Sequence, residues 1–283
     1  MWYVIGCIAT NVLLLIWLRI LRMPLLTLIT LNYLVCVGWV FVLEPPSWGA
    51  VIDMSGLGLV ALGVLGVLFI SVFGLTGYVS RSLGVGLAGM LAKLSLVLPI
   101  GFAAMFLDEP LSLFQQAALL TGTGAIVVVH FPYLRAGRWR PLLQGISPGF
   151  LLWLSNGVID ILFKAALPLW KTLSPLHIPF WIMGLAGIIG LLTHFFQRRA
   201  PLLLQPRLWL GALLLGTTNL LSLYFYLKGL ETLPAAQFFL WNNIGVILVA
   251  GVVGTLLFQE PLTWAGIIGY GLGVVSILLS SLK

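Results

Sequence analysis

Residues 56–79 read GLGLVALGVLGVLFISVFGLTGYV and contain no charged side chain and no proline. A helix needs about 20 predominantly apolar residues to cross the hydrocarbon core of a bilayer. The apolar run here is continuous, whereas a strand of a membrane β-barrel alternates apolar and polar residues. The stretch therefore predicts a transmembrane helix and places the chain among helical membrane proteins.

The composition of the whole chain agrees with this prediction. Of its 283 residues, 61% are hydrophobic and only 7% are charged, and the mean hydropathy is +1.14. A soluble domain carries about a quarter charged residues, so this chain has too few charges to cover a surface in water. The net charge of +7 comes from basic residues in short connections, where they set topology and meet lipid headgroups. No nucleic-acid partner is expected.

Outward from residues 56–79, similar apolar runs predict about ten transmembrane helices. They are expected at residues 2–20, 24–43, 56–79, 83–106, 112–130, 148–169, 177–196, 208–228, 234–257 and 262–282. Pro99 falls inside the fourth of them and is expected to kink its helix. Little chain is left for a soluble domain, so we expect an all-α membrane protein whose solvent is the lipid bilayer.

A weak internal repeat organises these helices into two halves. The sequence LDEPLS at residues 107–112 precedes the fifth helix, and FQEPLT at residues 258–263 precedes the tenth. Thr-Asn at residues 10–11 is followed by Arg19, and Ser-Asn at residues 155–156 is followed by Lys164 at the same spacing. Several matches in the same order predict a duplication, with halves at residues 1–140 and 141–283.

The two predicted halves enter the membrane from opposite sides, because five helices is an odd number. Such inverted repeats are common in transporters, whose substrate site lies near the midplane between the halves. A third match joins Tyr78 to Tyr226. Arginines gather in alternate connections, and this bias places both termini outside the cell.

This organisation resembles the drug/metabolite transporter superfamily, and within it the EamA-like ten-helix exporters. The resemblance rests on two five-helix halves, each with a Glu-Pro pair before a glycine-rich last helix, and it covers essentially the whole chain. It implies a multi-pass protein of the bacterial inner membrane that exports or exchanges amino acids, other metabolites or drugs. The superfamily usually has both termini in the cytoplasm, opposite to the arginine bias, so the orientation stays open.

Three ionisable residues are predicted to lie inside the membrane, where a charge is costly and marks function by default. Asp160 is the only acid in the middle of a predicted helix, and Asn156, Asp160 and Lys164 form one polar stripe at helical spacing. One interpretation is an Asp160–Lys164 ion pair that only holds the helix in register. The other is a substrate or proton site, in which Lys93 of the fourth helix takes part.

The predicted interior contains one acid and two bases, and this excess of positive charge favours an anionic group on the substrate. Amides at similar depth either bind substrate or form hydrogen bonds between helices. Glu109 and Glu260 are expected to be helix-end groups at the start of the helices that follow them. The predicted substrate-binding residues are Asn11, Lys93, Asn156, Asp160, Lys164, Asn219, Trp241 and Asn242.

The function that these features predict is secondary active transport, by export or exchange, of a small polar metabolite such as an amino acid or an organic anion. Protons are a candidate coupling ion, and a monomer suffices to enclose a path. The alternatives are a flippase for a lipid-linked headgroup and a membrane partner subunit that transports nothing. An enzyme is not expected, because Ser, His and Asp form no nucleophile–base cluster in the sequence. A bound cofactor and a metal site are not expected either, because no phosphate-binding loop and no ligand-spaced histidines are present.

Overall fold

The computed structural model describes residues 1–21, 23–46, 54–82, 85–129, 148–198, 205–259 and 263–282, together with residues 49, 51, 131 and 203. Its helices are α1 (Trp2–Ile20), α2 (Leu25–Leu43), α4 (Gly56–Ser82), α5 (Val85–Leu94), α6 (Val97–Phe106), α7 (Leu113–Val129), α9 (Pro148–Ala166), the 3-10 turn η3 (Leu167–Trp170), α10 (His177–Phe196), α11 (Pro206–Thr232), α12 (Ala235–Phe258) and α13 (Trp264–Ser280). The predicted boundary at residues 140 and 141, Glu260, and five of the arginines behind the orientation argument (Arg22, Arg135, Arg138, Arg140 and Arg199) lie outside the described residues.

The prediction of an all-α membrane chain is confirmed within the described residues, which contain no strand. In the part of the chain that the structure describes, six helices are long and apolar enough to cross a membrane: Leu25–Leu43, Gly56–Thr76, Pro148–Trp170, His177–Phe196, Pro206–Thr232 and Ala235–Leu257. Four shorter apolar helices accompany them: Trp2–Leu18, Leu91–Phe106, Leu113–Val129 and Trp264–Ser280. Because these four are short, the count of ten membrane crossings stays a prediction.

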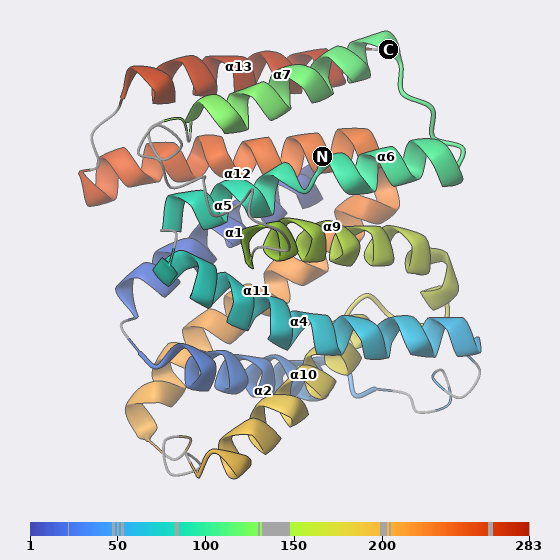
Figure 1. The fold of residues 1–283 in the computed structure, drawn as a ribbon. Helices are drawn as coiled ribbons and strands as arrows, with labels where there is room; N and C mark the ends of the chain where they lie inside the picture. The colour runs from blue at the N-terminus through green and yellow to red at the C-terminus, as the bar shows by residue number, and fades with distance from the viewer. Residues whose placement is uncertain are drawn as a thin grey trace.

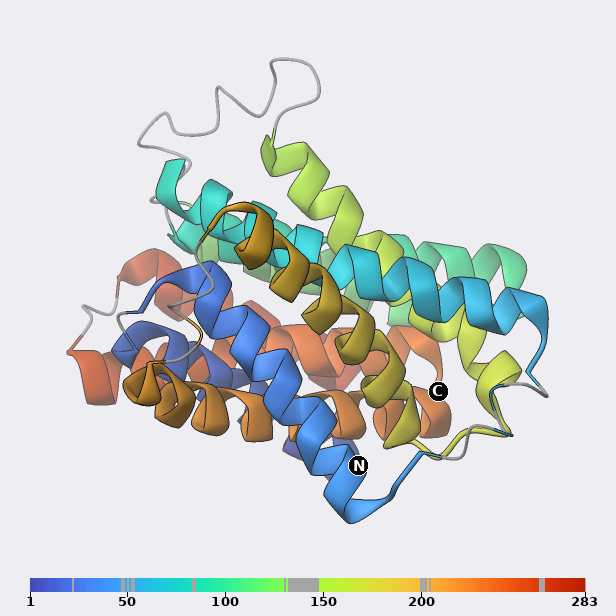
Figure 2. The same cartoon turned by 90° about the horizontal axis from the view of Figure 1, so that it is seen from below.

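The helices lie side by side in one bundle, with α7 and α13 packed together along one edge and α2 and α10 along the other (Figure 1). Figure 2 shows α2 and α10 in front, seen from below. Between these two pairs, α1 packs on α11 and α12, and α9 packs on α4, α5 and α6. Helices far apart in the sequence therefore surround the middle of the bundle.

The predicted fourth helix is divided by a turn at Ser95 and Leu96, where α5 ends and α6 begins. Pro99 explains the break, because its ring has no N–H to donate and clashes with the carbonyl of the residue four positions earlier, which is Ser95. The hydroxyl of Ser95 donates a hydrogen bond to the Ala92 carbonyl oxygen at 2.7 Å. Lys93 is thus placed in the last turn of α5, just before the break.

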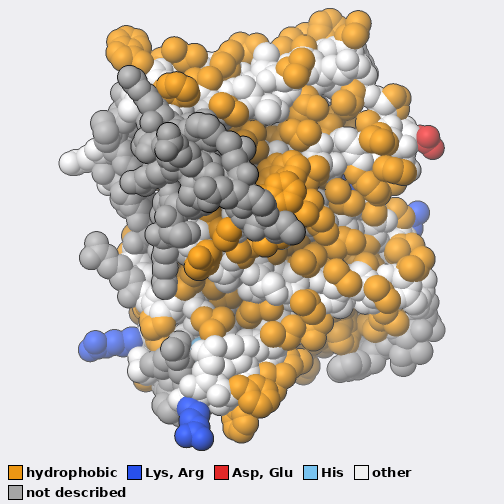
Figure 3. Space-filling model, viewed as in Figure 1, with side chains coloured by type: hydrophobic (Ala, Val, Ile, Leu, Met, Phe, Trp, Pro, Cys, Tyr) orange, Lys and Arg blue, Asp and Glu red, His pale blue; other side chains and the backbone are white. Residues whose placement is uncertain are grey.

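The outer surface of the bundle is apolar, and its charged side chains lie near the ends of the helices. Figure 3 shows hydrophobic side chains across one face, with Lys, Arg, Asp and Glu side chains toward its two edges. Large exposed apolar residues include Val60, Leu120, Leu210 and Leu256. Lipid is the solvent that accommodates such a surface.

Candidate functional site

Asp160 of α9 and Tyr226 of α11 form the hydrogen bond at the centre of the candidate site. The Tyr226 hydroxyl donates to Oδ1 of Asp160 at 2.6 Å, a length typical of a bond to a charged acceptor. Edge-to-face contacts hold the Tyr226 ring against Phe163 and Phe238, with centroid distances of 5.4 and 5.0 Å. The packed aromatic rings therefore fix the hydroxyl that points at the carboxylate.

Lys93 of α5 lies close enough to attract the Asp160 carboxylate electrostatically, and its charge also acts on Cys7 of α1. The ion pairs within 4.0 Å among the described residues join other groups, and Lys93 takes part in none of them. Opposite charges thus stand near each other inside the bundle without direct contact. We call Cys7, Lys93, Asp160 and Tyr226 the polar centre.

The polar centre draws its members from both predicted halves of the chain, with α1 and α5 from the first and α9 and α11 from the second. Asn11 lies one turn beyond Cys7, and its Nδ2 donates to the Cys7 carbonyl oxygen at 2.8 Å. Asn156 lies one turn before Asp160 and donates to the Leu152 carbonyl oxygen at 2.8 Å. Both amides extend the polar surface along helices that already carry a member of the centre.

Lys164, the last residue of the predicted stripe, contacts Glu109 and not Asp160. Its Nζ lies 2.8 Å from Oε1 of Glu109, and Oε2 of the same carboxylate accepts a hydrogen bond from the backbone N–H of Ala235 at 2.7 Å. The predicted excess of positive charge is corrected by this pair, because Glu109 brings a second acid to the interior. The ion pair between Asp160 and Lys164 that sequence analysis considered is not the one formed.

Glu109 is a helix-end group, but of a different helix from the one expected. The sequence motif places it before α7, whereas the carboxylate caps Ala235, the first residue of α12. A carboxylate at this position complements the positive end of the helix dipole. Glu109 therefore connects the loop after α6 to two helices of the second half, α9 and α12.

The remaining predicted site residues make their contacts elsewhere in the bundle. Asn219 of α11 donates to Oδ1 of Asn32 on α2 at 3.3 Å. Trp241 of α12 donates from Nε1 to the Ser280 hydroxyl of α13 at 2.8 Å. Asn242 is 4% exposed, and its Oδ1 has no hydrogen-bond partner within the described part of the chain. No contact in the structure joins these three to the polar centre within the described ranges.

Sequence analysis missed Cys7 and Tyr226 as members of the centre, and it gave Glu109 too local a role. A signal existed for Tyr226, which matches Tyr78 in the internal repeat. Another existed for Glu109, whose motif recurs before the last helix. Cys7 gave no signal of its own, because a cysteine in an apolar helix is most often a small packing residue.

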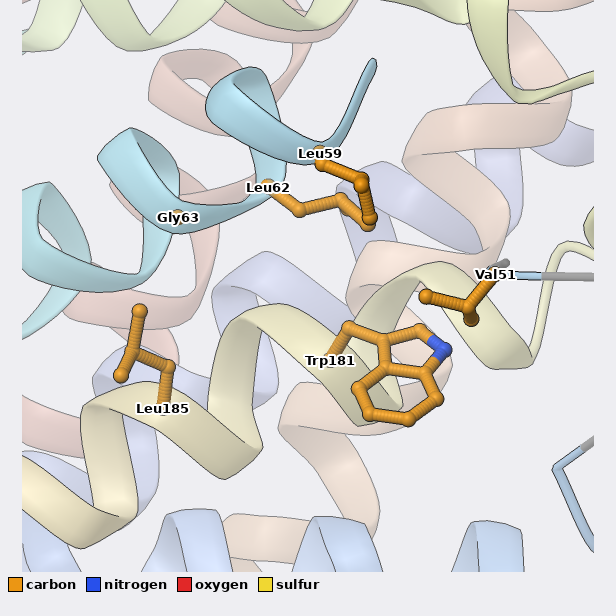
Figure 4. Close-up of a pocket in the computed structure, with 6 residues that line it drawn as sticks. All are labelled: Val51, Leu59, Leu62, Gly63, Trp181 and Leu185. Carbon is orange, nitrogen blue, oxygen red and sulfur yellow. The ribbon is translucent and has the colours of Figure 1, made fainter. Parts of the chain in front are cut away.

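The apolar hollow drawn in Figure 4 is separate from the polar centre. It has a volume of about 180 Å³ and lies between α4 and α10, lined by Val51, Leu59, Leu62, Gly63, Trp181 and Leu185. None of these side chains carries a charge. Among the described residues, no group of three or more His, Cys, Asp or Glu side chains gathers in a way that could hold a metal ion.

Three comparisons show which known proteins this chain is similar to. Residues 143–282 match the model of the EamA-like transporter family. The chain is 27% identical to an uncharacterised protein of Haemophilus influenzae over 210 residues, which are 72% of this chain and 70% of that protein. A crystal structure of another protein has the same fold, with a TM-score of 0.74 at 14% identity over 99% of this chain and 96% of that one.

Proposed function

We propose, on the premise that residues 143–282 belong to the EamA-like transporter family, that this chain moves a small polar metabolite by secondary active transport. The family and the apolar helices make the chain a multi-pass membrane protein and a transporter of the drug/metabolite type. The proposal adds alternating access between the halves, with export or exchange across a bacterial inner membrane. One chain suffices to enclose the path, so the functional unit is a monomer.

The observation that carries the proposal is that Lys93 and Asp160, the two opposite charges of the polar centre, form no direct ion pair among the described residues. An ionisable side chain inside a bilayer needs a partner or a wet cavity. Among the described residues, Asp160 has one hydrogen bond from Tyr226, and Lys93 has only electrostatic attraction without a direct ion pair. Both therefore keep bonding capacity for a ligand, at the meeting point of helices from the two halves.

The pattern of helix packing supports the inverted repeat on which alternating access depends. In an inverted repeat, the five predicted transmembrane helices of the first half correspond in order to the five of the second. Here α5 and α6 together make the fourth, so α1 matches α9, α2 matches α10, α4 matches α11, α5 with α6 matches α12, and α7 matches α13. Exchanging the halves then turns the contact of α1 with α11 into that of α9 with α4, and the contact of α2 with α11 into that of α10 with α4. It also turns α1 on α12 into α9 on α5 and α6.

The charges of the polar centre favour a zwitterionic substrate such as an amino acid. Lys164 is neutralised by Glu109, which leaves one cation, Lys93, and one anion, Asp160, to meet the substrate. A substrate carboxylate would bind the Lys93 ammonium, and a substrate ammonium would bind the Asp160 carboxylate. A simple anion would leave the buried carboxylate of Asp160 without a positive partner.

Asp160 is also the carboxyl group best placed to couple transport to protons, because it is the acid of the polar centre. The hollow of Figure 4 gives no support to a flippase, since its lining is apolar and includes no member of the polar centre. A partner subunit that transports nothing would be expected to close its buried charges into a direct ion pair.

The test is solute uptake into proteoliposomes under an imposed proton gradient, with the wild type beside Asp160→Asn. The panel contains neutral amino acids, organic anions and amines. We expect the wild type to accumulate a zwitterion and Asp160→Asn to reduce uptake at least tenfold, because the amide keeps the shape of the carboxyl group and loses its charge.

Glu231→Gln is the matched control, because it removes a carboxylate from the Lys228–Glu231 pair within α11 at the end of the bundle. Uptake by this variant should equal that of the wild type. If a solute moves and Asp160→Asn transports it equally well, the assigned site is wrong. If the folded wild type moves none of the three solute classes, the proposed function fails, and lipid-linked substrates become the next panel.

A further inference from the structure

The Glu109 carboxylate connects three separate segments at one end of the bundle. This end, which we call the terminal face, is where α1 begins, α9 and η3 end and α12 begins. Oε1 of Glu109 lies 2.8 Å from Nζ of Lys164, and Oε2 accepts the hydrogen bond from Ala235 at 2.7 Å. The side chains of Lys164 and Glu109 are only 12% and 29% exposed. A single carboxylate thus binds the first half of the chain to two helices of the second.

The backbone before Glu109 is folded to deliver its side chain to this position. Asp108 has a φ of 52°, in the left-handed region that side chains other than glycine rarely adopt. The turn brings the N–H of Glu109 back to the Ala103 carbonyl oxygen of α6 at 3.3 Å. Pro110 follows and disfavours a helical backbone at Glu109, and α7 begins only at Leu113. The backbone contacts of this loop therefore fix the position of the Glu109 carboxylate.

The contact lies directly above the polar centre. Lys164 follows Asp160 by one helical turn on α9, so both project from the same side of that helix. This turn of α9 and the start of α12 therefore lie between the centre and the terminal face, on the side where a substrate could leave. Separating α12 from α9 requires that Glu109 release either Ala235 or Lys164.

We propose that Glu109, Lys164 and the first turn of α12 form a latch that keeps the terminal face of the transporter closed. This inference rests on the proposed function and adds to it the residues that gate one side of the path. The latch opens when α12 moves away from α9 and the Lys164–Glu109 contact breaks. The state in the structure is the closed one at this face.

Lys164 has a second partner ready when the latch opens, which makes the opening reversible. A buried cation left alone is strongly destabilised, but Asp160 is four residues away on the same helix, within reach of an intrahelical pair. Moving from Glu109 to Asp160 keeps the lysine paired in both states. The same move occupies the carboxylate that holds the substrate cation, and the substrate is then released toward the open face.

Native Cys7 provides the measurement, because it is buried in the polar centre and the chain has only one other cysteine, Cys36. In a Cys36→Ala background, a membrane-impermeant thiol reagent is applied separately to each face of sealed vesicles without substrate. Glu109→Gln and, independently, Lys164→Met should make labelling of Cys7 from the terminal face at least about tenfold faster, as expected when a charge-assisted hydrogen bond is lost. Labelling from the opposite face should not increase.

Two controls separate opening of the latch from general loosening. Glu231→Gln breaks an ion pair at the same face without joining two helices, and should leave Cys7 labelling unchanged. Cys36 is buried between α2 and α11, and in a Cys7→Ala background its labelling should not respond to Glu109→Gln. The latch is disproved if Cys7 labelling stays at the wild-type rate in both latch variants, or if Cys36 labelling rises equally.

The outcome is independent of the uptake assay. Faster Cys7 labelling with no transported solute would support the latch as the closure over Cys7, while the proposed transport of a small polar metabolite fails. Uptake that depends on Asp160, with Cys7 labelling unaltered by the latch variants, would establish transport and remove the latch.

Discussion

Tyr226 gives Asp160 part of what water gives an exposed carboxylate, namely a strong hydrogen-bond donor. One donor is fewer than the carboxylate accepts, since its two oxygens provide about four lone-pair sites. The hydroxyl also comes from a ring that is clamped between Phe163 and Phe238. At the scale of single residues, packed rings therefore fix one hydrogen-bond donor of the carboxylate, and its other lone pairs keep capacity for further donors.

Replacing Tyr226 by Phe tests whether the hydrogen bond from its hydroxyl to the Asp160 carboxylate contributes to transport. The ring and its packing remain, while the hydrogen bond to a charged group, worth about 1.5–3 kcal/mol, is lost. We expect the maximal rate of uptake divided by its KM to fall at least about tenfold, with little change in the melting temperature of the purified protein. Uptake kinetics and thermal unfolding in detergent provide the two readouts.

Tyr224→Phe is the matched control on the same helix, because Tyr224 packs edge-to-face on Phe225 and makes no contact with Asp160 among the described residues. It should transport like the wild type. Equal loss in both variants would mean that α11 is sensitive to hydroxyl removal in general, and the special role of Tyr226 would be rejected.

Predicted depth in the membrane singled out Asp160, Lys93 and Lys164 as candidate site residues, because charges in apolar helices stand out in any sequence. The residues that they pair with could not be predicted in the same way. Lys164 had two acids within reach, one on its own helix and one in a loop of the other half. Only the folded position of the Glu109 loop decides between them, and no local pattern contains that information.

At the scale of helices, the glycines of α7 and α13 determine how closely this pair packs. A Cβ atom on Gly269 would lie 2.9 Å from the backbone nitrogen of Val129 and 3.0 Å from the carbonyl oxygen of Ala125. Both are backbone atoms of α7, which cannot move away by a change of rotamer as a side chain can. Gly271, two residues later on α13, has nothing within 4 Å.

Gly269→Ala should therefore destabilise the protein, and Gly271→Ala should not. Forcing a methyl group into a packed contact costs about 1–3 kcal/mol, while alanine in an open helical position is favoured over glycine by up to about 1 kcal/mol. Thermal unfolding of the two variants in the same detergent measures the difference. A Gly269→Ala protein as stable as the wild type would show that α7 and α13 can separate without loss.

The positions of the helices followed from the lengths of the apolar runs, since each run needs its own backbone hydrogen bonds in lipid and forms a helix. The break before Pro99 was less predictable, because a proline can bend a helix or end it. Helix partners such as α1 and α11 could not be predicted from sequence, because an apolar helix face packs almost equally well on lipid and on protein.

At the scale of the whole molecule, most pairs of described helices that pack together combine one helix from each predicted half. The halves are therefore intertwined and do not form two separate bodies. We expect residues 1–140 and residues 141–283, expressed together as two chains, to associate and to recover transport. Each half expressed alone should be degraded, since its contact surface is missing.

Copurification through a tag on one half measures this association. As a reference, the chain can be divided between residues 82 and 85, which separates α4 from α5 but leaves fewer helices in the first piece. If either half accumulates as a stable monomer in the membrane, the contacts between the halves contribute less than the packing indicates.

The partners of α1 have a consequence for the synthesis of the protein. Cys7 and Ser222 are in contact although 215 residues separate them, and α11 emerges from the ribosome long after α1. At roughly 5–20 residues per second, α1 waits on the order of 10–40 s in the membrane before its neighbours exist. During that interval Asn11 is satisfied by its own helix, through the Cys7 carbonyl oxygen. The first helix thus enters the translocon already equipped to stay inserted as a nascent segment, and completes its packing only when translation is nearly finished.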